Sequence, residues 1–417
     1  MGSSKILSRL GENWHQRATV IIMLLLGASL AFKDQYSTIV MILLLALGLA
    51  LFVFKRPKFS KARLKLLIWI PLLLILPRIL GLFYGEFDNA TKELVRSIPL
   101  LVLPLAFVLI GLQANNKKIY KALYVGALAG IVLFTLICYY PVITTMIEKD
   151  QPLSYLLRWR YMNFNFTQPF DAHPAYIGLL VIWLIAQTFF SDLVKPKWRI
   201  WIVLGLLIVL FQLVARNALL VAFVLIAIYV IKSKMKWLQI AAISVAVGLT
   251  AAVIFHPSTY LEDKLFYIFK ADNEQVQDKR FTRLEASFQV FKQHPIFGPG
   301  PGTDNKLRTQ TYLEMGETIA YEKNYNAHNQ FVEFLSTYGI VGASCFVLAL
   351  LLAFRLSVRD KNWVDVILLS ALVIAMLTES LLERSLGVKY LSLVIALVLF
   401  NHLIKSRESS LLDGSGS

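Results

Sequence analysis

The sequence predicts an all-α, polytopic membrane protein with about 12 transmembrane helices and one large extramembrane helical loop. Of its 417 residues, 57% are hydrophobic and only 16% are charged. The mean hydropathy of +0.62 lies far above that of a chain folded in water. These values, with long apolar runs separated by short basic segments, exclude an ordinary soluble multidomain protein.

Apolar runs of nearly spanning length recur along the chain, since one crossing needs on the order of 20 residues and slightly fewer when the ends snorkel. The first apolar run ends in charged residues, without a small-residue cleavage site, so we expect no cleavable signal peptide. The predicted spans are 18–32, 37–54, 66–83, 97–112, 122–143, 174–190, 200–214, 218–231, 237–255, 331–354, 363–382 and 389–404.

Basic residues set the expected orientation. Both termini and the short loops on their side hold 23 Lys and Arg residues, whereas the opposite short loops hold five. Cations favour the cytoplasmic side, so both termini are expected there. Residues 1–255 then carry helices 1–9, 256–330 form the large outer loop, 331–407 carry helices 10–12 with a cytoplasmic tail, and 408–417 form a disordered tail ending in a linker-like Gly-Ser repeat.

Composition also limits the chemistry. The net charge of +16 is scattered among apolar runs, so it indicates topology and disfavours nucleic-acid binding. Cys138 and Cys345 lie inside apolar runs, which favours small packing residues over a disulfide or metal pair. Asp-x-Asp, P-loop and HExxH motifs are absent from the sequence. We therefore expect neither a metal nor a cofactor.

The large outer loop has a helical pattern of its own. Residues 281–294 place Leu284, Phe288 and Phe291 near helical spacing among polar residues, which predicts an amphipathic helix. Pro295 and the Gly-Pro-Gly-Pro-Gly run at 298–302 end that helix and predict rigid turns. A second short helix is expected over 304–314.

Three arginines are candidate anion-binding residues on the outer side. Arg216 lies in a minimal turn between two apolar runs, against the orientation preference for cations. Arg280 and Arg283 begin the amphipathic helix, where a guanidinium can fork onto two phosphate oxygens. The alternative for each is a solvated or lipid-facing cation. Together, the three guanidinium groups are suited to binding a lipid diphosphate.

His328 is the candidate general base, because imidazole can accept a proton from an attacking hydroxyl near neutral pH. Its alternative is a helix cap. Asn326 and Asn329 beside it suit sugar hydroxyls, or simply end the loop. His173 has the same ambiguity before another helix, and His294 is interpreted as a helix-end residue.

Three carboxylates near these residues receive structural interpretations. Glu333 is expected to brace Asn329 or the entrance of the helix after the loop. Glu379 and Glu383 stand four residues apart near the end of a predicted span, and with Arg384 they are expected to form a buried polar cluster.

Three segments in this order resemble the O-antigen ligase family, within the group of lipid-linked-oligosaccharide ligases and O-antigen polymerases. The first is the arginine turn Ala-Arg-Asn-Ala at 215–218, where the family commonly has Ser-Arg-Gly. The second is Arg280, followed fifteen residues later by Pro295 and the glycine-rich run. The third is Asn-Ala-His-Asn-Gln-Phe at 326–331, ending in Tyr-Gly-Ile-Val-Gly at 338–342. Spacing to Pro295 favours Arg280 over Arg283 as the family's loop arginine.

The resemblance implies transfer of a glycan from undecaprenyl diphosphate to a hydroxyl on the periplasmic face of the bacterial inner membrane, without a metal. Arg216 and Arg280 would stabilise the departing diphosphate, and His328 would orient or deprotonate the acceptor. The implied partners are the undecaprenyl-diphosphate-linked glycan, a lipid A-core or other hydroxyl acceptor, and membrane lipids.

Alternatives within this chemistry are a polysaccharide polymerase and a protein O-oligosaccharyltransferase, which differ only in the acceptor. A lipid or glycan transporter is a different class, for which repeated halves and polar groups through the midplane are expected. A structural membrane scaffold predicts no penalty for neutralising Arg216 or Arg280.

Overall fold

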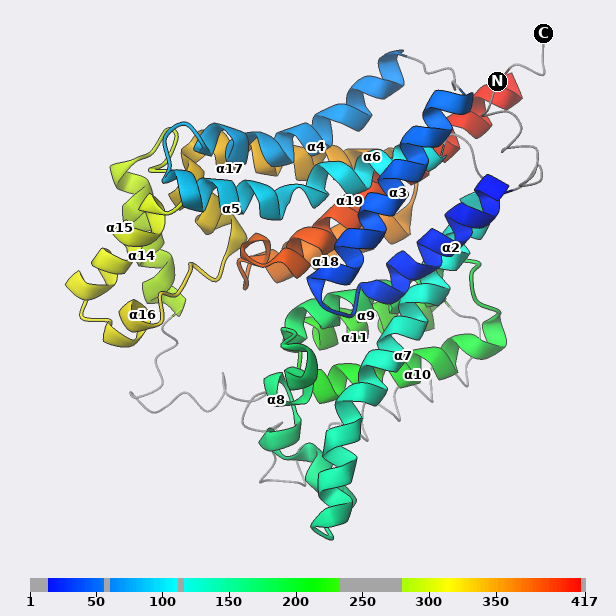
Figure 1. The fold of residues 1–417 in the computed structure, drawn as a ribbon, viewed down its shortest axis with the longest axis horizontal. Coiled ribbons are helices and arrows are strands. Elements are labelled where there is room, and N and C mark those ends of the chain that lie inside the picture. The colour runs from blue at the N-terminus through cyan, green and yellow to red at the C-terminus, as the bar shows by residue number, and fades with distance from the viewer. Residues whose placement is uncertain (1–13, 56–60, 112–115, 233–279, 414–417) are drawn as a thin grey trace, which may run out of the picture. The chain divides into compact units, whose positions relative to one another are not determined.

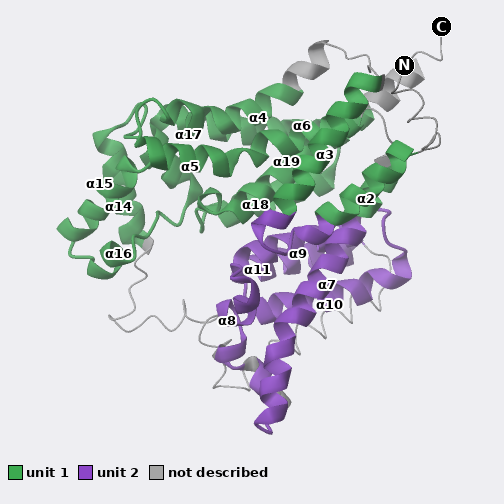
Figure 2. Cartoon of the chain, viewed as in Figure 1, with its two compact units in different colours: residues 1–26, 37–123, 278–417 green, residues 27–36, 124–277 purple. Residues whose placement is uncertain are grey.

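The structure, a computed structural model, describes residues 14–55, 61–111, 116–232 and 280–413. In these ranges the chain is helical, with turns and no β-strand (Figure 1). It divides into two compact units (Figure 2). Unit 1 comprises residues 1–26, 37–123 and 278–417, and unit 2 comprises 27–36 and 124–277.

Six helical segments of the described chain are long and apolar enough to cross a membrane. A bent pair, Phe164–Phe170 and Pro174–Phe190 at 87°, would make seven. The six are Asp34–Phe54, Phe87–Gly111, Lys117–Glu148, Pro196–Leu213, Gln330–Arg359 and Ser385–Lys405. The all-helical, multi-pass class is therefore confirmed, whereas the count of about 12 is not.

Eleven of the twelve predicted spans overlap a described helix. The twelfth, 237–255, lies outside the described residues, as does 256–279, the start of the predicted large loop. Several helices extend beyond the predicted spans, such as α7 at Asn116–Glu148 against 122–143, and one falls clearly short. Helix α18 (Trp363–Met376) ends six residues before the predicted 382, and the next residues form turns and the 3₁₀ helix η5 (Leu381–Glu383). The polar residues of this connection therefore do not share a helix face.

Two helix pairs form much of unit 1. Helix α19 (Ser385–Asp413) packs on α6 (Pro99–Gly111), where Phe107 and Phe400 meet edge to face and Gly111 leaves room for Phe400. Helix α17 (Gln330–Arg359) packs on α4 (Lys61–Gly81). Helices α3 (Asp34–Lys55) and α5 (Phe87–Ser97) lie mostly or wholly in unit 1 as well (Figure 1). Between Ser385 and Lys405, α19 is strongly apolar and largely buried, as expected for a central helix.

Helix α17 is broken at Gly339, where φ is 62° and ψ is −166°. The turn at 295–300 packs against this break and forms hydrogen bonds with its backbone. Ile340 N donates to Pro295 O at 2.9 Å, and Gly300 N donates to Thr337 O at 3.0 Å. A Cβ on Gly298 would lie 2.2 Å from Thr337 O. The glycines thus let two backbones approach, and the turn satisfies groups that the broken helix leaves unpaired.

Three helices precede the broken helix in the chain: α14 (Arg280–Gln293), α15 (Thr303–Glu314) and α16 (Thr318–Glu322). The first two confirm the helices predicted over 281–294 and 304–314. Ala286, Tyr312 and Ala320 form their shared core, with Tyr325 packed against it. Tyr312 also donates its hydroxyl to Tyr325 O at 3.2 Å. This core fixes the chain just before the candidate histidine.

Unit 2 contains most of α7 (Asn116–Glu148) with α8 (Phe164–Thr167), α9 (Pro174–Phe190), α10 (Pro196–Leu213) and α11 (Arg216–Lys232). Helix α9 packs on both α10 and α11. Gly178 allows this approach, because a Cβ there would lie 2.8 Å from that of Ala218. The turn between α10 and α11 uses Val214 in the left-handed region, at φ 48°.

Candidate functional site

The segment 326–329 holds His328 in a left-handed backbone conformation, with φ 49°. A residue other than glycine adopts this conformation at a cost of about 1–2 kcal/mol, so neighbouring groups must hold it. The Asn326 side-chain oxygen accepts from His328 N at 3.1 Å, and the Glu333 carboxylate accepts from Ala327 N at 2.7 Å. Asn329 then caps α17, accepting from the backbone N–H of the second and third residues after it.

The imidazole of His328 faces a carboxylate. His328 Nδ1 lies 3.3 Å from Glu379 Oε2, and about a quarter of each side chain is exposed. If Nδ1 carries the proton, it donates to Glu379 and Nε2 remains the ring's acceptor. This pairing resembles the base and orienting acid of hydrolytic triads. Sequence spacing did not indicate it, because 51 residues separate the partners.

Arg283 approaches the same histidine through Tyr325. The Arg283 guanidinium lies 4.1 Å from the Tyr325 ring centroid, and that ring meets the His328 ring edge to face at 6.0 Å. Arg283 is partly exposed, and its buried Nε has no hydrogen-bond partner among the described residues. A cation is therefore fixed one aromatic ring away from the imidazole.

The residues that follow α18, including η5, hold the start of α17 by hydrogen bonds. Asn329 Nδ2 donates to Leu377 O at 3.1 Å, and Leu382 N donates to the buried Gln330 Oε1 at 2.6 Å. Ser380 Oγ donates to Glu333 Oε2 at 3.3 Å. Two of these three bonds use backbone groups of residues beyond the end of α18, Leu377 O and Leu382 N.

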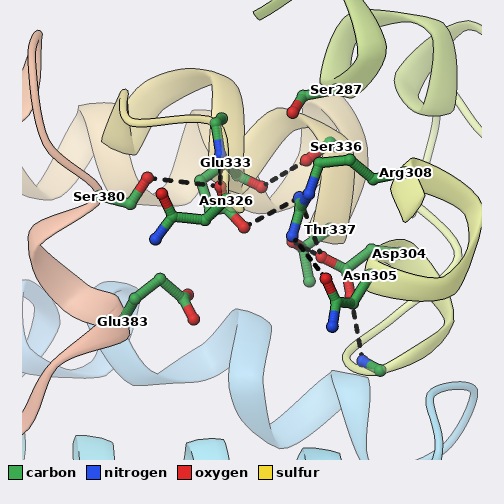
Figure 3. A network of polar contacts seen from close by, with 12 residues as sticks. Ser287, Asp304, Asn305, Arg308, Asn326, Glu333, Ser336, Thr337, Ser380 and Glu383 are labelled. Atoms are coloured by element: carbon green, nitrogen blue, oxygen red, sulfur yellow. Dashed lines mark hydrogen bonds and ion pairs between the residues drawn. The ribbon is translucent and has the colours of Figure 1, made fainter. Parts of the chain in front are cut away.

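Arg308 forms a buried ionic network beside Glu333 at the start of α17 (Figure 3). Its Nη1 lies 3.0 Å from Glu333 Oε1 and 3.7 Å from Asp304 Oδ2, and all three residues are at most 4% exposed. Asp304 also accepts from Gly302 N at 3.0 Å and from Thr337 Oγ1 at 2.7 Å. Burial opposes the charged form of Arg308, but the carboxylates of Glu333 and Asp304 raise the pKa of its guanidinium above the ordinary value.

A further polar group joins α4, α5 and α17. The Tyr338 hydroxyl donates to Glu93 Oε2 at 2.5 Å, and the Arg78 guanidinium lies 4.9 Å from the Phe334 ring centroid. Arg96 pairs with Glu383 at 3.6 Å. Burial, together with the Glu93 carboxylate, raises the pKa of Glu383 above its usual range.

Glu379 and Glu383 therefore do not form one cluster with Arg384, contrary to the sequence-based prediction. Glu379 faces His328, Glu383 faces Arg96, and Arg384 is exposed. Helix α18 ends before either glutamate, so the helical spacing that suggested a shared face does not apply. The bracing role predicted for Glu333 is confirmed, since it accepts the Ala327 N–H at the helix entrance.

The remaining predicted residues lie apart from His328 in the chain. Arg280 is the first residue of α14, and its side chain lies outside the described part of the structure. Arg216 begins α11 and belongs to unit 2, so its gathering with His328 stays a prediction. His173 caps α9 by accepting from Ala175 N at 3.2 Å, and His294 is exposed after the end of α14. The structure thus brings Arg283, Asn326 and Asn329 to His328.

Among the described residues, no group of three or more His, Cys, Asp or Glu side chains is placed to hold a metal ion. The cations and carboxylates near His328 pair mainly with one another. Their fixed charges and hydrogen bonds can orient a proton acceptor and attract an anion.

One family model matches part of the chain. Residues 201–347 match the family model described as O-Antigen ligase. This match supports an O-antigen ligase family assignment. It spans the arginine turn of α11, helices α14–α16, and His328 with the first half of α17. Members of the O-antigen ligase family are membrane glycosyltransferase-like enzymes. No curated protein matches the chain.

Proposed function

We propose that this protein is an O-antigen ligase, a metal-independent inverting glycosyltransferase. It moves a glycan from undecaprenyl diphosphate to a hydroxyl of lipid A-core oligosaccharide on the periplasmic face. The observation that carries the proposal is the His328–Glu379 pair, with Arg283 held nearby on Tyr325. His328, Arg283 and Tyr325 lie within the segment matched to the O-antigen ligase family.

His328 acts as the general base in this proposal. Glu379 accepts the proton on Nδ1, so Nε2 accepts the proton of the attacking hydroxyl. The acceptor oxygen bonds to the anomeric carbon as that carbon's bond to the diphosphate oxygen breaks. Undecaprenyl diphosphate leaves, and direct displacement inverts the anomeric configuration.

Arginines stabilise the charge that develops on the departing diphosphate. Arg283 supplies one guanidinium at the described site, and Arg216 and Arg280 supply the others. Each positioned donor contributes about 2.7–4 kcal/mol of barrier lowering, so fixed guanidinium charge can take the role that a divalent cation has in other transferases.

The prenyl chain lies against apolar helix faces, which the membrane-spanning segments provide in abundance. The glycan extends into the periplasm, and both termini are cytoplasmic. Reporter fusions at the C-terminus test this orientation: an alkaline phosphatase fusion that is active only outside the cytoplasm should be inactive there.

Transfer by purified protein tests the chemistry. His328→Ala is expected to lower turnover by about 10²–10⁴-fold while membrane insertion is unchanged, because the general base is lost. The assay supplies undecaprenyl-diphosphate glycan with lipid A-core, glycan or protein acceptors in separate reactions containing EDTA. Normal turnover by His328→Ala removes the proposed base, and loss of wild-type activity with EDTA alone contradicts metal independence.

The labelled acceptor decides between the ligase and its closest alternatives. A labelled lipid A-core supports the proposed function. A lengthened lipid-linked glycan indicates a polymerase, and a labelled protein hydroxyl indicates a protein O-oligosaccharyltransferase.

A further inference from the structure

Glu333 occupies a position that the proposed reaction does not use directly. It lies in the first turn of α17, where its own N–H donates to Asn329 O at 2.9 Å. Its carboxylate reaches back across that turn and accepts from Ala327 N at 2.7 Å. A negative group is favourable at this end of a helix, and here it also holds the residue before His328.

Arg308 fixes the other oxygen of that carboxylate. Nη1 lies 3.0 Å from Glu333 Oε1, and Nη2 donates to Asn305 Oδ1 at 3.2 Å (Figure 3). Arg308 and Glu333 are almost wholly buried. Glu333 therefore receives an ion pair on one oxygen and backbone and hydroxyl donors on the other, which leaves its carboxylate little freedom to turn.

The same network reaches the glycine-rich turn. Asp304 contacts Arg308 and accepts from Gly302 N and from Thr337 Oγ1. The turn at 295–302, the start of α15 and the histidine segment are thus joined by continuous contacts. Stability alone explains such a network poorly, because the desolvation of a buried ion pair offsets much of its attraction.

We propose that the Arg308–Glu333 ion pair positions His328 for catalysis by holding the Ala327 N–H, and that Glu333 is a positioning residue of the transfer reaction. This inference rests on the proposed function. The pair acts on the backbone of the segment, whereas Glu379 acts on the imidazole ring. The two supports are therefore separable by experiment.

Glu333→Gln and Glu333→Leu test the inference in the full-length protein. Glutamine retains one carbonyl oxygen, which can accept from Ala327 N or face Arg308 but not both; leucine offers neither. We expect kcat to fall about 10-fold or more for glutamine and further for leucine, while KM for the lipid-linked glycan stays within about threefold. This ordering follows from the number of contacts retained.

Asp365→Asn is the matched control. Asp365 is also a buried carboxylate in the first turn of a helix, α18, and accepts from the side-chain amides of Asn362 and Asn401. Its substitution is expected to lower the melting temperature without changing kcat. An equal loss of kcat in Asp365→Asn and Glu333→Gln would show that general destabilisation explains the effect, and would overturn the proposal.

Hydrogen exchange supplies a readout that needs no activity. Peptides covering 325–330 should exchange about tenfold faster or more in Glu333→Leu than in wild type, because the Ala327 N–H loses its acceptor. Unchanged exchange, or faster exchange with wild-type kcat, overturns the positioning role. If the wild type transfers glycan to none of the acceptors, the proposed function fails and the positioning role with it, while exchange still shows whether Glu333 holds the segment.

Discussion

Glu379→Gln should slow transfer by weakening the orientation of His328. The two groups lie 3.3 Å apart, slightly beyond the usual range for a hydrogen bond, and each is about a quarter exposed. A hydrogen bond to a charged group contributes about 1.5–3 kcal/mol, and this distance and exposure favour the lower end. A loss of about 1.5–2 kcal/mol corresponds to roughly 10- to 30-fold in kcat.

The assay is steady-state transfer to lipid A-core by protein in nanodiscs, with kcat and KM measured separately. Glu379→Leu should lose more than Glu379→Gln, because the amide oxygen can still accept from Nδ1 whereas leucine cannot. Glu322→Gln is the control, since Glu322 is an exposed glutamate at the end of α16. It should have wild-type kcat.

A double variant separates orientation from other effects. If Glu379 acts through the imidazole, Glu379→Gln should add little to the loss already caused by His328→Ala. Wild-type kcat in Glu379→Leu, or a full additional loss in the double variant, would refute the inferred role of this pair.

Three further outcomes follow from the same geometry. Gly298→Ala should lower the unfolding free energy by about 2 kcal/mol or more, and with it the melting temperature, because φ is +70° and the new Cβ would meet backbone atoms. Gly205→Ala is the control: Gly205 has open space around it in α10, so this variant should leave the melting temperature unchanged or raise it. Arg283→Lys should lower kcat/KM about tenfold although the charge is kept, since lysine lacks the planar fork; full retention in transfer assays argues against an anion contact. The raised pKa of Glu383 means that the folded protein binds the proton of this carboxyl more tightly than the unfolded chain does. The unfolding free energy should therefore decline as pH rises from the ordinary carboxyl range toward neutrality. This decline should be steeper in wild type than in Glu383→Gln, which cannot titrate at this position. Melting curves across pH check this, and identical slopes would contradict it.

Local patterns predicted much of the segment 280–329. Helical spacing gave α14, and the Gly-Pro run gave the turns around Gly298 and Gly300. These features depend on neighbours within a few residues, which the sequence displays directly. The insertion of that turn into a broken α17 did not follow, because Gly339 in an apolar run looks like any tolerated helical glycine.

The site was harder to predict because its contacts join side chains that lie far apart in the sequence. His328 was predicted as the base from its imidazole chemistry and its place before a helix, but its carboxylate partner Glu379 was assigned to a helix face with Glu383. Arg78 and Glu93 were overlooked because Arg78 lies within an apolar run and Glu93 in an amphipathic helix before one. Burial reveals Arg78, and the hydrogen bond from Tyr338 reveals Glu93, since a charge inside a membrane protein needs partners that only the folded chain brings together.

The glycine-rich turn has two consequences that arise from one backbone arrangement. Gly298 and Gly300 allow the turn to supply hydrogen bonds to the broken α17, and Gly302 N donates to Asp304 beside Arg308. The break shortens the first part of α17 to the stretch between Asn329 and Gly339, and that stretch carries Glu333. Its orientation is then set by contacts at both ends: the turn at Thr337, and the connection after α18 at Gln330. A continuous helix would tie His328 to the packing of the membrane-spanning part, whereas the broken helix lets the turn at 295–302 and the connection after α18 set the position of the histidine.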